Sequence, residues 1–216
     1  MICPICEHNT LPFLHVALAK RFGHCPVCEC IHLEKTYQLS NEKEKEKYDQ
    51  HQNSLENTGY VEMFENFLDF FWNELTCKDY CGLDFGSGPT PVLRELMQRR
   101  GANVDCYDKF YQPLPVYENK NYDFITSTEV FEHLDNPKEV LTLLAGLLKP
   151  NGTMALMTLF HDNDREHFLT WWYPRDLTHI TFYTPKTLQI LGKMCGLEVL
   201  KTDNKRILVF KKSSED

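Results

Sequence analysis

From residue 80 onward, short apolar runs alternate with longer segments of helical periodicity, and this alternation constrains the fold more than any other feature. The runs that we predict to be strands cover residues 81–85, 104–107, 122–127 and 153–158. Strands that alternate with helices are joined by crossovers, which give a mainly parallel sheet with helices on both faces. Two closing strands, residues 197–202 and 206–211, are separated by only three residues, so we expect them to pair antiparallel. The predicted fold class is therefore α/β.

A polar residue followed by proline marks the start of three predicted helices. The polar side chain caps the first N–H groups, and proline suits the first helical position because it has no N–H of its own. The three pairs are Thr90–Pro91, Asn136–Pro137 and Thr184–Pro185. Residues 60–75 carry apolar side chains at helical spacing and predict an amphipathic helix that caps the core. The alternating charges of residues 41–48 predict a solvated helix or linker without a function of its own.

The composition excludes several classes of protein. A chain of 216 residues, 42% of them apolar, can bury one sizeable core with a small satellite domain. The net charge of −8 argues against a general nucleic-acid binder, which needs a basic footprint. The sequence contains no apolar run of about 18 residues, so no membrane span is predicted. The first residues lack the pattern of a signal peptide. We therefore expect a cytoplasmic protein whose thiols stay reduced; its oligomeric state is left open.

Two C-P-x-C pairs lie within the first 30 residues. They place Cys3 and Cys6 in one tight turn and Cys25 and Cys28 in another. Two thiolates from each turn can close a tetrahedral site that suits Zn²⁺, with iron on the same four thiolates as the alternative. Four thiolates leave no open position, so the predicted site is structural. Cys30 is offset from its pair and is expected to be a spare.

These patterns divide the chain into three parts. Residues 1–38 are predicted to form a zinc ribbon, residues 39–76 a charged linker with the amphipathic helix, and residues 77–216 the α/β core. The ribbon carries no net positive charge, which favours a role in stabilising the fold and in docking against the core. Recognition of a substrate or partner is the alternative role for the ribbon.

The loop after the first core strand is rich in glycine. It contains Asp84, Gly86, Ser87 and Gly88. Glycines here let the backbone approach a ligand at the carboxyl end of a strand. A dinucleotide fingerprint would need glycine or alanine where Pro91 stands, which disfavours a dehydrogenase. The stretch instead resembles the first motif of class I S-adenosylmethionine-dependent methyltransferases, (D/E)-x-G-x-G-x-G, with Thr90 at the third glycine position.

Further motifs extend this resemblance over about residues 80–210. Asp108, at the end of the next strand, lies 22 residues after Gly86 and is expected to bind the ribose hydroxyls. The stretch from Tyr122 through Glu132-His133-Leu is similar to the family's fourth-strand motif. The resemblance implies that the cofactor passes beside Thr128, Glu129 and Val130, with His133 close to the site and Tyr60 closing it from the linker side.

The resemblance implies a Rossmann-like methyltransferase sheet, with one departure. Only 14 residues separate Asp108 from Asp123, where the family usually fits a helix and a strand. The adenine contacts are therefore unassigned, and the short connection allows a sheet with one strand fewer than the family usually has. His51 and Asn53, ahead of the core, are further candidates to close the site.

The segment of residues 171–185 is the strongest candidate for the chemistry. It follows the strand that ends near residue 158, so it starts at the ligand-binding edge of the sheet. Similar stretches precede a proline-started helix in the family. We predict that His179 is a general base, that Asp176 orients it, and that Tyr173 or Arg175 holds the acceptor. The alternative is that the histidine only fixes the loop by hydrogen bonds.

The sequence thus predicts a methyltransferase that uses S-adenosylmethionine, carries a structural Zn²⁺ and acts on a small-molecule methyl acceptor. Two alternatives stay open: methylation of RNA or protein with the ribbon as the recognition element, and a non-catalytic ribbon-plus-Rossmann scaffold. Nucleic acid is disfavoured as a partner by the acidic charge, and no membrane association is expected.

Overall fold

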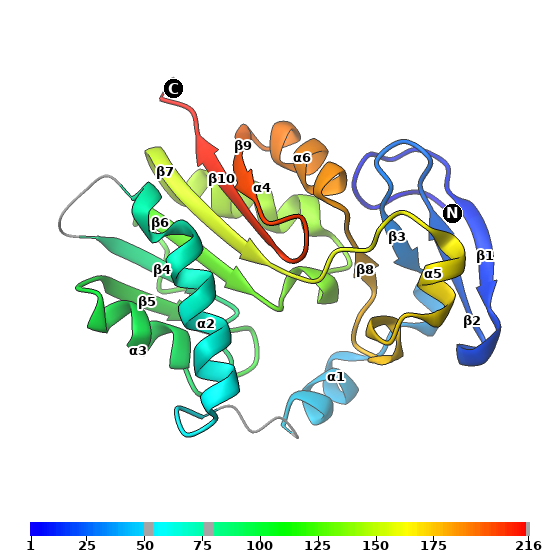
Figure 1. The fold of residues 1–216 in the computed structure, drawn as a ribbon, viewed down its shortest axis with the longest axis horizontal. Coiled ribbons are helices and arrows are strands. Elements are labelled where there is room, and N and C mark those ends of the chain that lie inside the picture. Colours follow the sequence, from blue (N-terminus) through cyan, green and yellow to red (C-terminus); the bar gives the residue numbers. More distant parts are fainter. Residues whose placement is uncertain (50–53, 76–79, 215–216) are drawn as a thin grey trace.

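The computed structural model describes residues 1–49, 54–75 and 80–214 and is drawn in Figure 1. Its strands are β1 (Leu11–His15), β2 (Lys20–His24), β3 (Ile31–Leu33), β4 (Cys81–Phe85), β5 (Asn103–Tyr107), β6 (Tyr122–Thr128), β7 (Leu148–Met157), β8 (Thr181–Phe182), β9 (Leu197–Thr202) and β10 (Ile207–Lys212). Its α-helices are α1 (Asn41–Tyr48), α2 (Thr58–Phe71), α3 (Val92–Arg99), α4 (Pro137–Leu147), α5 (Arg165–Thr170) and α6 (Pro185–Met194).

Six strands form the main sheet, in the order β5-β4-β6-β7-β10-β9. β4 pairs parallel with β5 and β6, and β6 pairs parallel with β7. β10 pairs antiparallel with β7 and β9, so the predicted closing hairpin is confirmed. Residues 109–121 contain no helix or extended strand, and β5 is therefore the sheet edge in the described part of the chain. The mainly parallel α/β fold is confirmed, with the short connection that the sequence indicated.

Helices cover both faces of this sheet. Successive residues of β10 point to opposite faces, as the period of a strand requires. Ile207 and Val209 belong to the core under α2 and α3, whereas Leu208 and Phe210 belong to the core under α4 and α6. Figure 1 shows α2 crossing in front of the sheet. The amphipathic helix predicted for residues 60–75 is confirmed as α2, which buries four apolar side chains.

The N-terminal ribbon is less separate than the sequence suggested. Its strands β1, β2 and β3 form a four-stranded antiparallel sheet whose fourth member is β8, from the far end of the chain. Figure 1 shows the ribbon at the right, beside α5 and β8. Neither α5 nor β8 is among the predicted helices and strands. A strand of two residues such as β8 has no periodicity to detect, and it exists only through its pairing with β3.

Strand β7 begins earlier than predicted. Residues Pro150-Asn-Gly152 favour a turn by composition, so the predicted strand begins only at Thr153. The strand instead starts at Leu148, and these residues form an irregularity within it. Tyr122 pairs with Leu148, whereas Phe124 pairs with Thr153, so four residues of β7 bulge between the two pairings. Asn151 has a positive φ of 58° there, which explains why the sequence reads locally as a turn.

The predicted helix caps are confirmed at two of three places. The side chains of Asn136 and Thr184 accept hydrogen bonds from the N–H group three residues further on. At the third, α3 begins at Val92 with Pro91 as its cap residue and no side-chain hydrogen bond. The prediction that Thr90 caps α3 is therefore wrong, because the chain enters the helix one residue later.

The charged run of residues 41–48 is a helix, α1, but it is not merely solvated. Glu44 is buried, and its Oε2 accepts a hydrogen bond of 2.9 Å from Lys109. The Tyr48 hydroxyl donates to Oε1 of the same carboxylate at 2.7 Å. The expectation of a merely solvated run is wrong, because the fold brings residues 108–112 against one side of the helix.

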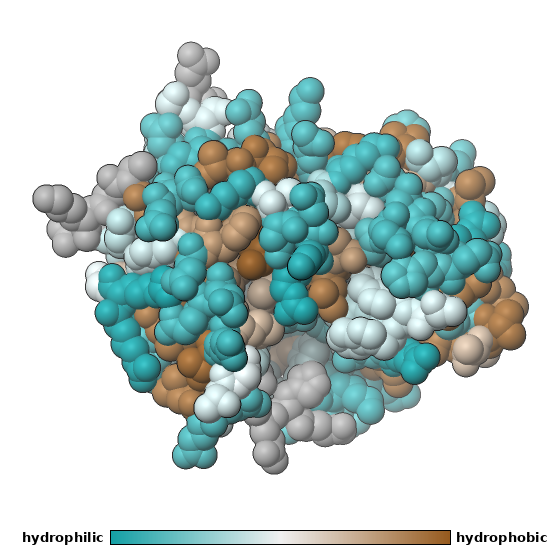
Figure 2. All heavy atoms as spheres, viewed as in Figure 1, coloured by the Kyte–Doolittle hydropathy of each residue, from teal (hydrophilic) through white to brown (hydrophobic). Residues whose placement is uncertain are grey.

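No helix within the described ranges is long and apolar enough to cross a membrane. Figure 2 shows a surface that is mostly hydrophilic on this face, with scattered hydrophobic side chains. Two of the exposed apolar side chains, Leu14 and Val16, belong to the outer edge of the ribbon. Scattered apolar residues of this kind are normal on protein surfaces.

Candidate functional site

A cavity of about 530 Å³ opens where strands β4, β5 and β6 end. Ligands bind at the carboxyl ends of the strands in open α/β sheets. In Figure 2 the surface is hollowed below its centre, between the sheet and α1. All residues predicted to contact the cofactor line the cavity: Tyr60, Asp84, Gly86, Ser87, Gly88, Asp108, Thr128, Glu129, Val130 and His133. Tyr173, Asp176 and His179 line it too, whereas the exposed Arg175 does not.

The glycine loop is held in place by the neighbouring strand. The N–H groups of Gly86 and Ser87 both donate to the carbonyl of Tyr107, at 2.7 and 3.2 Å. Gly86 has a φ of 86°, and a Cβ atom there would overlap the side chain of Val130. Gly88 also has a positive φ, but a Cβ atom on it would meet no atom within 4 Å. The first glycine is thus required by packing, and the second leaves open space beside the cavity.

Asp108 connects the end of β5 to this loop. Its Oδ2 accepts a hydrogen bond of 3.0 Å from the N–H group of Gly88. Its Oδ1 accepts bonds from the N–H groups of Phe110 and Tyr111, at 2.8 and 3.0 Å. Three backbone donors hold the carboxylate at the cavity wall. This is the place where an acidic side chain binds ribose hydroxyls in nucleotide-binding βαβ units.

Asp84 is a buried acid at the base of the cavity. Burial raises its pKa to about 7, which a hydrogen bond of 2.9 Å from the hydroxyl of Thr126 opposes and the nearby charge of Asp108 supports. Tyr60, on α2, lines the same cavity, and burial raises the pKa of its phenol. Asp84 can therefore exchange a proton near neutral pH when a cation binds next to it.

Two further carboxyl groups lie at the end of β6. Glu129 has a φ of 54°, uncommon for a residue with a side chain. Burial raises the pKa of both Glu129 and Glu132, and the negative charge of Glu132 raises that of Glu129 further. Oε1 of Glu129 and Oε2 of Glu132 are buried without a hydrogen-bond partner. The pair favours a state in which at least one carboxyl group keeps its proton.

Two imidazoles lie side by side above this pair. The rings of His133 and His179 are 4.9 Å apart between centroids. Nδ1 of His133 is 3.0 Å from the carbonyl oxygen of Thr178, and Nδ1 of His179 is 2.9 Å from that of Tyr173. Because a carbonyl oxygen can only accept, both Nδ1 atoms carry the proton in the neutral rings, and both Nε2 atoms are the basic ones.

The roles predicted for the neighbours of His179 change in detail. The ring is oriented by the Tyr173 carbonyl, whereas Asp176 Oδ2 lies 3.9 Å from the other nitrogen, Nε2. Burial opposes ionisation of Asp176, but hydrogen bonds from the Thr178 N–H and hydroxyl groups outweigh it and lower its pKa. The Tyr173 hydroxyl donates to the buried Glu132 at 2.6 Å. Asp176 can thus stabilise a positive charge on His179.

Helix α1 supplies part of the wall that sequence reasoning missed. Glu44 and Tyr48 line the cavity, and the Tyr48 ring packs on Phe110 and on His133, at 5.8 and 5.3 Å between centroids. The available sequence signal was the aromatic Tyr48 at the end of the charged run. The other candidates from this region, His51 and Asn53, lie outside the described residues.

Carboxylates dominate the charge of the cavity. Among its lining residues, the acidic ones are Glu44, Asp84, Asp108, Glu129 and Asp176, and Lys109 is the cationic one apart from the two histidines. Lys109 pairs with Glu44 at 2.9 Å. Such a lining favours a cationic ligand over an anionic one.

The four cysteines of the ribbon come together as predicted. The sulfur atoms of Cys3 and Cys28 are 3.4 Å apart, those of Cys6 and Cys25 are 3.5 Å apart, and all four lie within 4.8 Å of one another. A tetrahedral ion with Zn–S bonds of about 2.3 Å needs sulfur atoms about 3.8 Å apart. The donor set therefore fits a structural Zn²⁺. Cys30 stays outside, with its thiol 3.7 Å from the carbonyl of Ile31.

A second group of donors lies at the cavity wall, where His133 and His179 line the cavity and Glu132 is buried beside them. Single ligand atoms of Glu132, His133 and His179 lie within 4.8 Å of one another. Two imidazoles and a carboxylate can hold a divalent ion, although the same groups also suit proton transfer. The two uses exclude each other at His179 Nε2, because a nitrogen that binds a metal cannot take up a proton.

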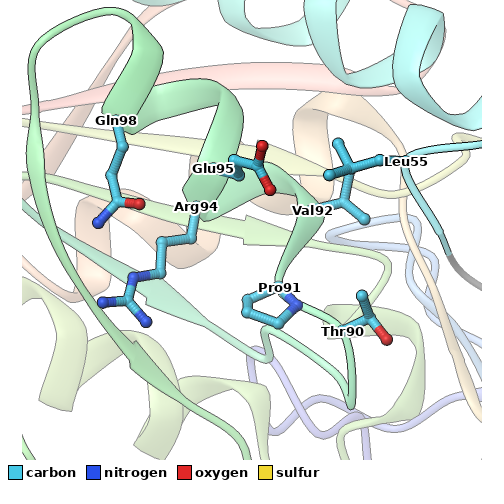
Figure 3. A pocket seen from close by; sticks show the side chains of 7 residues that line it. All are labelled: Leu55, Thr90, Pro91, Val92, Arg94, Glu95 and Gln98. Atoms are coloured by element: carbon cyan, nitrogen blue, oxygen red, sulfur yellow. The ribbon is translucent and has the colours of Figure 1, made fainter.

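A separate cavity of about 390 Å³ lies on the outer side of α3. Figure 3 shows Arg94, Glu95 and Gln98 projecting from this helix, with Pro91 and Leu55 nearby. Thr90 and Val92 line both cavities. None of the residues predicted to bind a cofactor or to catalyse lies here, so this cavity flanks the candidate site without containing it.

Comparison with known proteins places this geometry in context. A family model described as a methyltransferase domain matches residues 38–202, which is more than half of the chain. The ubiquinone biosynthesis O-methyltransferase of Photobacterium profundum is 33% identical over 81 residues, covering 38% of this chain and 34% of that protein. The same enzyme from Dinoroseobacter shibae is 30% identical over 144 residues, covering 62% of this chain and 56% of that protein. The matches thus span roughly a third to a half of these curated relatives.

Solved structures share the fold at low sequence identity. Magnesium protoporphyrin IX methyltransferase from Synechocystis PCC 6803, with bound SAH, superposes with a TM-score of 0.53 at 13% identity, over 80% of this chain and 94% of that one. An O-methyltransferase family protein from Burkholderia thailandensis has a TM-score of 0.53 at 14% identity, over 84% of this chain and 64% of that one.

Proposed function

Because the chain belongs to the methyltransferase-domain family, we propose that this S-adenosylmethionine-dependent methyltransferase acts on a hydroxyl group of a small aromatic molecule bound beside His179. The observation that carries the proposal is the division of the cavity. Its glycine loop, Asp84 and Asp108 form one half, and the two imidazoles with Asp176 form the other. The relatives named above support oxygen as the acceptor atom, and the rings of Tyr48, Phe110 and Trp172 support an aromatic acceptor.

The cofactor half suits the charge of S-adenosylmethionine. When bound, this molecule supplies an electrophilic methyl group on a positively charged sulfur. Asp108 would hold the ribose hydroxyls, and the glycine loop would lie against the amino-acid part. The carboxylates Asp84 and Glu129 would favour the cation, while the space beside Gly88 admits the ligand without a steric conflict. Thr128, Val130 and Tyr60 would complete the walls by packing.

The acceptor half suits removal of a proton. A phenolic hydroxyl has a pKa near 10, so a base within reach raises its nucleophilicity at neutral pH. His179 would accept the acceptor's proton at Nε2, since its Nδ1 is fixed by the Tyr173 carbonyl. Asp176, 3.9 Å from Nε2, would stabilise the imidazolium that forms. His133 would pack against the acceptor and provide a second basic nitrogen.

We also propose that the ribbon cysteines hold one Zn²⁺. Atomic emission on protein prepared under reducing conditions should give about one zinc per chain and no iron, because four thiolates close one tetrahedral site. A value near two would assign a second ion to the group of Glu132, His133 and His179. A value near zero would remove the metal from the ribbon.

Transfer of a labelled methyl group separates the alternatives. The protein is incubated with methyl-tritiated S-adenosylmethionine and a panel of catechols and phenols, or with a cell extract divided into small molecules, RNA and protein. Label in a phenolic product, lost in His179→Ala, supports the proposal. Label in RNA or protein would replace the small-molecule acceptor with a macromolecule. No transfer despite cofactor binding would leave a non-catalytic scaffold.

A further inference from the structure

The ribbon and the acceptor half of the cavity share one sheet. β3 pairs with β8 through Ile31 opposite Phe182 and His32 opposite Thr181. One residue further on, the Leu33 N–H group donates to the Ile180 carbonyl at 2.8 Å. β8 belongs to the ribbon's sheet and not to the six-stranded one. The backbone that immediately follows His179 is therefore hydrogen-bonded to the ribbon.

The two parts also share a hydrophobic core. One buried cluster joins ribbon residues to the segment that carries the acceptor half; its members are Phe22, Ile31, Leu33, Phe168, Tyr173, Ile180 and Phe182. The Phe22 and Phe168 rings pack edge to face, 5.4 Å apart between centroids. Tyr173 is 1% exposed, so its ring has its place only while this cluster is assembled.

A direct link leads from the metal-binding turn to the same region. The Thr187 hydroxyl, fully buried at the start of α6, donates to the carbonyl of Cys28 at 2.7 Å. Next to it, Glu29 accepts hydrogen bonds from Thr184 and Lys186, at 2.9 and 3.0 Å. The second C-P-x-C turn is thus held against the residues that directly follow β8.

The ribbon-docked segment also supplies the hydrogen-bond partners of the two imidazoles. The carbonyl groups that fix their tautomers are those of Tyr173 and Thr178, both in the ribbon-docked segment. The backbone of Ile180 connects the ribbon to the end of β6: its N–H group donates to the backbone carbonyl of Glu132, and its carbonyl accepts from the N–H group of Leu33. Release of the ribbon would therefore free both imidazoles from the carbonyls that hold them.

The cofactor half is built differently. The glycine loop and Asp108 are held by backbone bonds within β4, β5 and the loops that follow them. The core under α2 and α3 on one face of the sheet contains no ribbon residue. On the other face, Leu83 and Phe85 of β4 belong to the same buried cluster as the ribbon cysteines. Because none of the hydrogen bonds that hold the glycine loop and Asp108 involves the ribbon, the integrity of this half should depend less on the metal.

We propose that the metal-loaded ribbon is the positioning element of the acceptor half: through the β3–β8 pairing and the Thr187–Cys28 hydrogen bond, it sets the orientation of His179 and His133. This inference rests on the proposed function only in naming the acceptor half; the structural coupling stands without it. The ribbon acts on the reaction through these residues and touches neither the acceptor nor the cofactor.

Metal removal from the folded protein tests this coupling. Hydrogen exchange followed by mass spectrometry compares the loaded protein with the protein after chelation, and calorimetry measures the affinity for S-adenosylhomocysteine in both. We expect amides of residues 173–183 to exchange at least roughly tenfold faster after chelation, with residues 81–108 unchanged. We expect the affinity for S-adenosylhomocysteine to stay within about twofold, since the hydrogen bonds that hold that half involve no ribbon residue.

Three outcomes would overturn the proposal. Unchanged exchange in residues 173–183 would show that the segment holds itself. Equal acceleration in residues 173–183 and 81–108 would make the ribbon a general stabiliser of the fold. Loss of S-adenosylhomocysteine binding together with acceleration would assign the ribbon to both halves. Absence of binding in the loaded protein would instead contradict the proposed function and leave the exchange result interpretable.

A variant pair isolates the direct link. Thr187→Val removes the hydroxyl that contacts Cys28, whereas Thr187→Ser keeps it. In a Trp72→Phe background, fluorescence reports Trp171 and Trp172, both in the ribbon-docked segment. Loaded Thr187→Val should show the emission of the chelated parent, and Thr187→Ser that of the loaded parent. Since Thr187 also caps α6, Asn136→Ala at the cap of α4 controls for the loss of a cap. Identical spectra for both Thr187 variants, or the same shift in Asn136→Ala, would contradict the link.

Discussion

The hydroxyl group of Tyr173 donates a hydrogen bond of 2.6 Å to Oε1 of Glu132, and both side chains are buried beneath the acceptor half of the cavity. The bond joins residues 41 positions apart in the chain. It fastens the segment that carries His179 to the end of β6. The raised pKa of Glu132, caused by burial, is partly offset by this donor. The contact therefore has a measurable role in stability.

Tyr173→Phe should lower the free energy of unfolding by about 1–3 kcal/mol, because it leaves a buried acceptor without its partner. Urea denaturation followed by circular dichroism measures the change. Glu132→Gln is the matched control, since its amide oxygen can still accept from the Tyr173 hydroxyl. A change below about 0.5 kcal/mol in Tyr173→Phe would mean that water or another group replaces the hydroxyl.

Asp108→Asn should weaken the binding of S-adenosylhomocysteine by at least roughly tenfold, because hydrogen bonds to a charged group contribute about 1.5–3 kcal/mol. Calorimetry measures the dissociation constant. Asp105→Asn on the same strand is the control, because that carboxylate is engaged by Lys120 and Tyr122 and does not line the cavity. Equal affinities in the two variants would remove Asp108 from the ribose site.

Binding of S-adenosylmethionine should depend on pH through Asp84. Its pKa of about 7 means that the carboxyl group is mostly protonated at pH 6 and mostly charged at pH 8. A cation binds the charged form better, so the affinity should rise with pH and level off above about 7, with up to roughly tenfold weaker binding at pH 6 than at pH 8. Calorimetry across this range gives the profile, and Asp84→Asn should flatten it. A profile that is equally steep in the variant would assign the proton to another group, such as Glu129.

Gly86→Ala and Gly88→Ala should fail in different ways. Both positions have positive φ, where a side chain costs about 1–2 kcal/mol. At Gly86 the added Cβ atom also overlaps Val130, so the main effect should be a lower melting temperature. At Gly88 the space is open, so the fold should tolerate alanine better while cofactor affinity falls. Thermal melts and calorimetry on both variants check this, and the reverse ranking in stability would contradict the packing argument.

His179→Ala should reduce methyl transfer by about 10²–10⁴-fold while leaving the affinity for S-adenosylmethionine within about twofold, as expected for loss of a general base. Initial rates with a labelled cofactor and an accepted phenol provide the measurement. His133→Ala is the comparison, because its ring lies beside His179 with the same tautomer. A larger loss in His133→Ala would transfer the role of base to that residue, and unchanged rates in both would leave only a structural role.

Much of the sheet could be predicted because its signals are local. The limits of β4 and β9 match the predicted strands to the residue. The convergence of the four cysteines could be predicted for the same reason, because the two cysteines of each pair are only three residues apart in the sequence. The bulge in β7 could not, because it depends on the register with β6.

The candidate site was predictable where a residue follows a strand and not where it comes from elsewhere. Asp84 and Asp108 end strands whose carboxyl ends must meet at one edge, so their convergence followed from the fold class. Glu44 and Tyr48 reach the same cavity from α1, and nothing in a run of alternating charges indicates which face packs. The tautomers of His133 and His179 depend on backbone carbonyls that only the folded chain supplies.

The sequence by itself therefore determined the α/β class, the clustering of the four ribbon cysteines and the convergence of Asp84 and Asp108 at one edge of the sheet. Periodicity, cysteine spacing and strand ends are all local features of the sequence. The tertiary structure alone decided that the ribbon's β3 pairs with β8, that α1 forms part of the cavity wall and that both imidazoles present Nε2 as the basic nitrogen. The physical reason is that most of these features are contacts between segments roughly 45 to 150 residues apart, whose free energy comes from surfaces that exist only once both partners are folded.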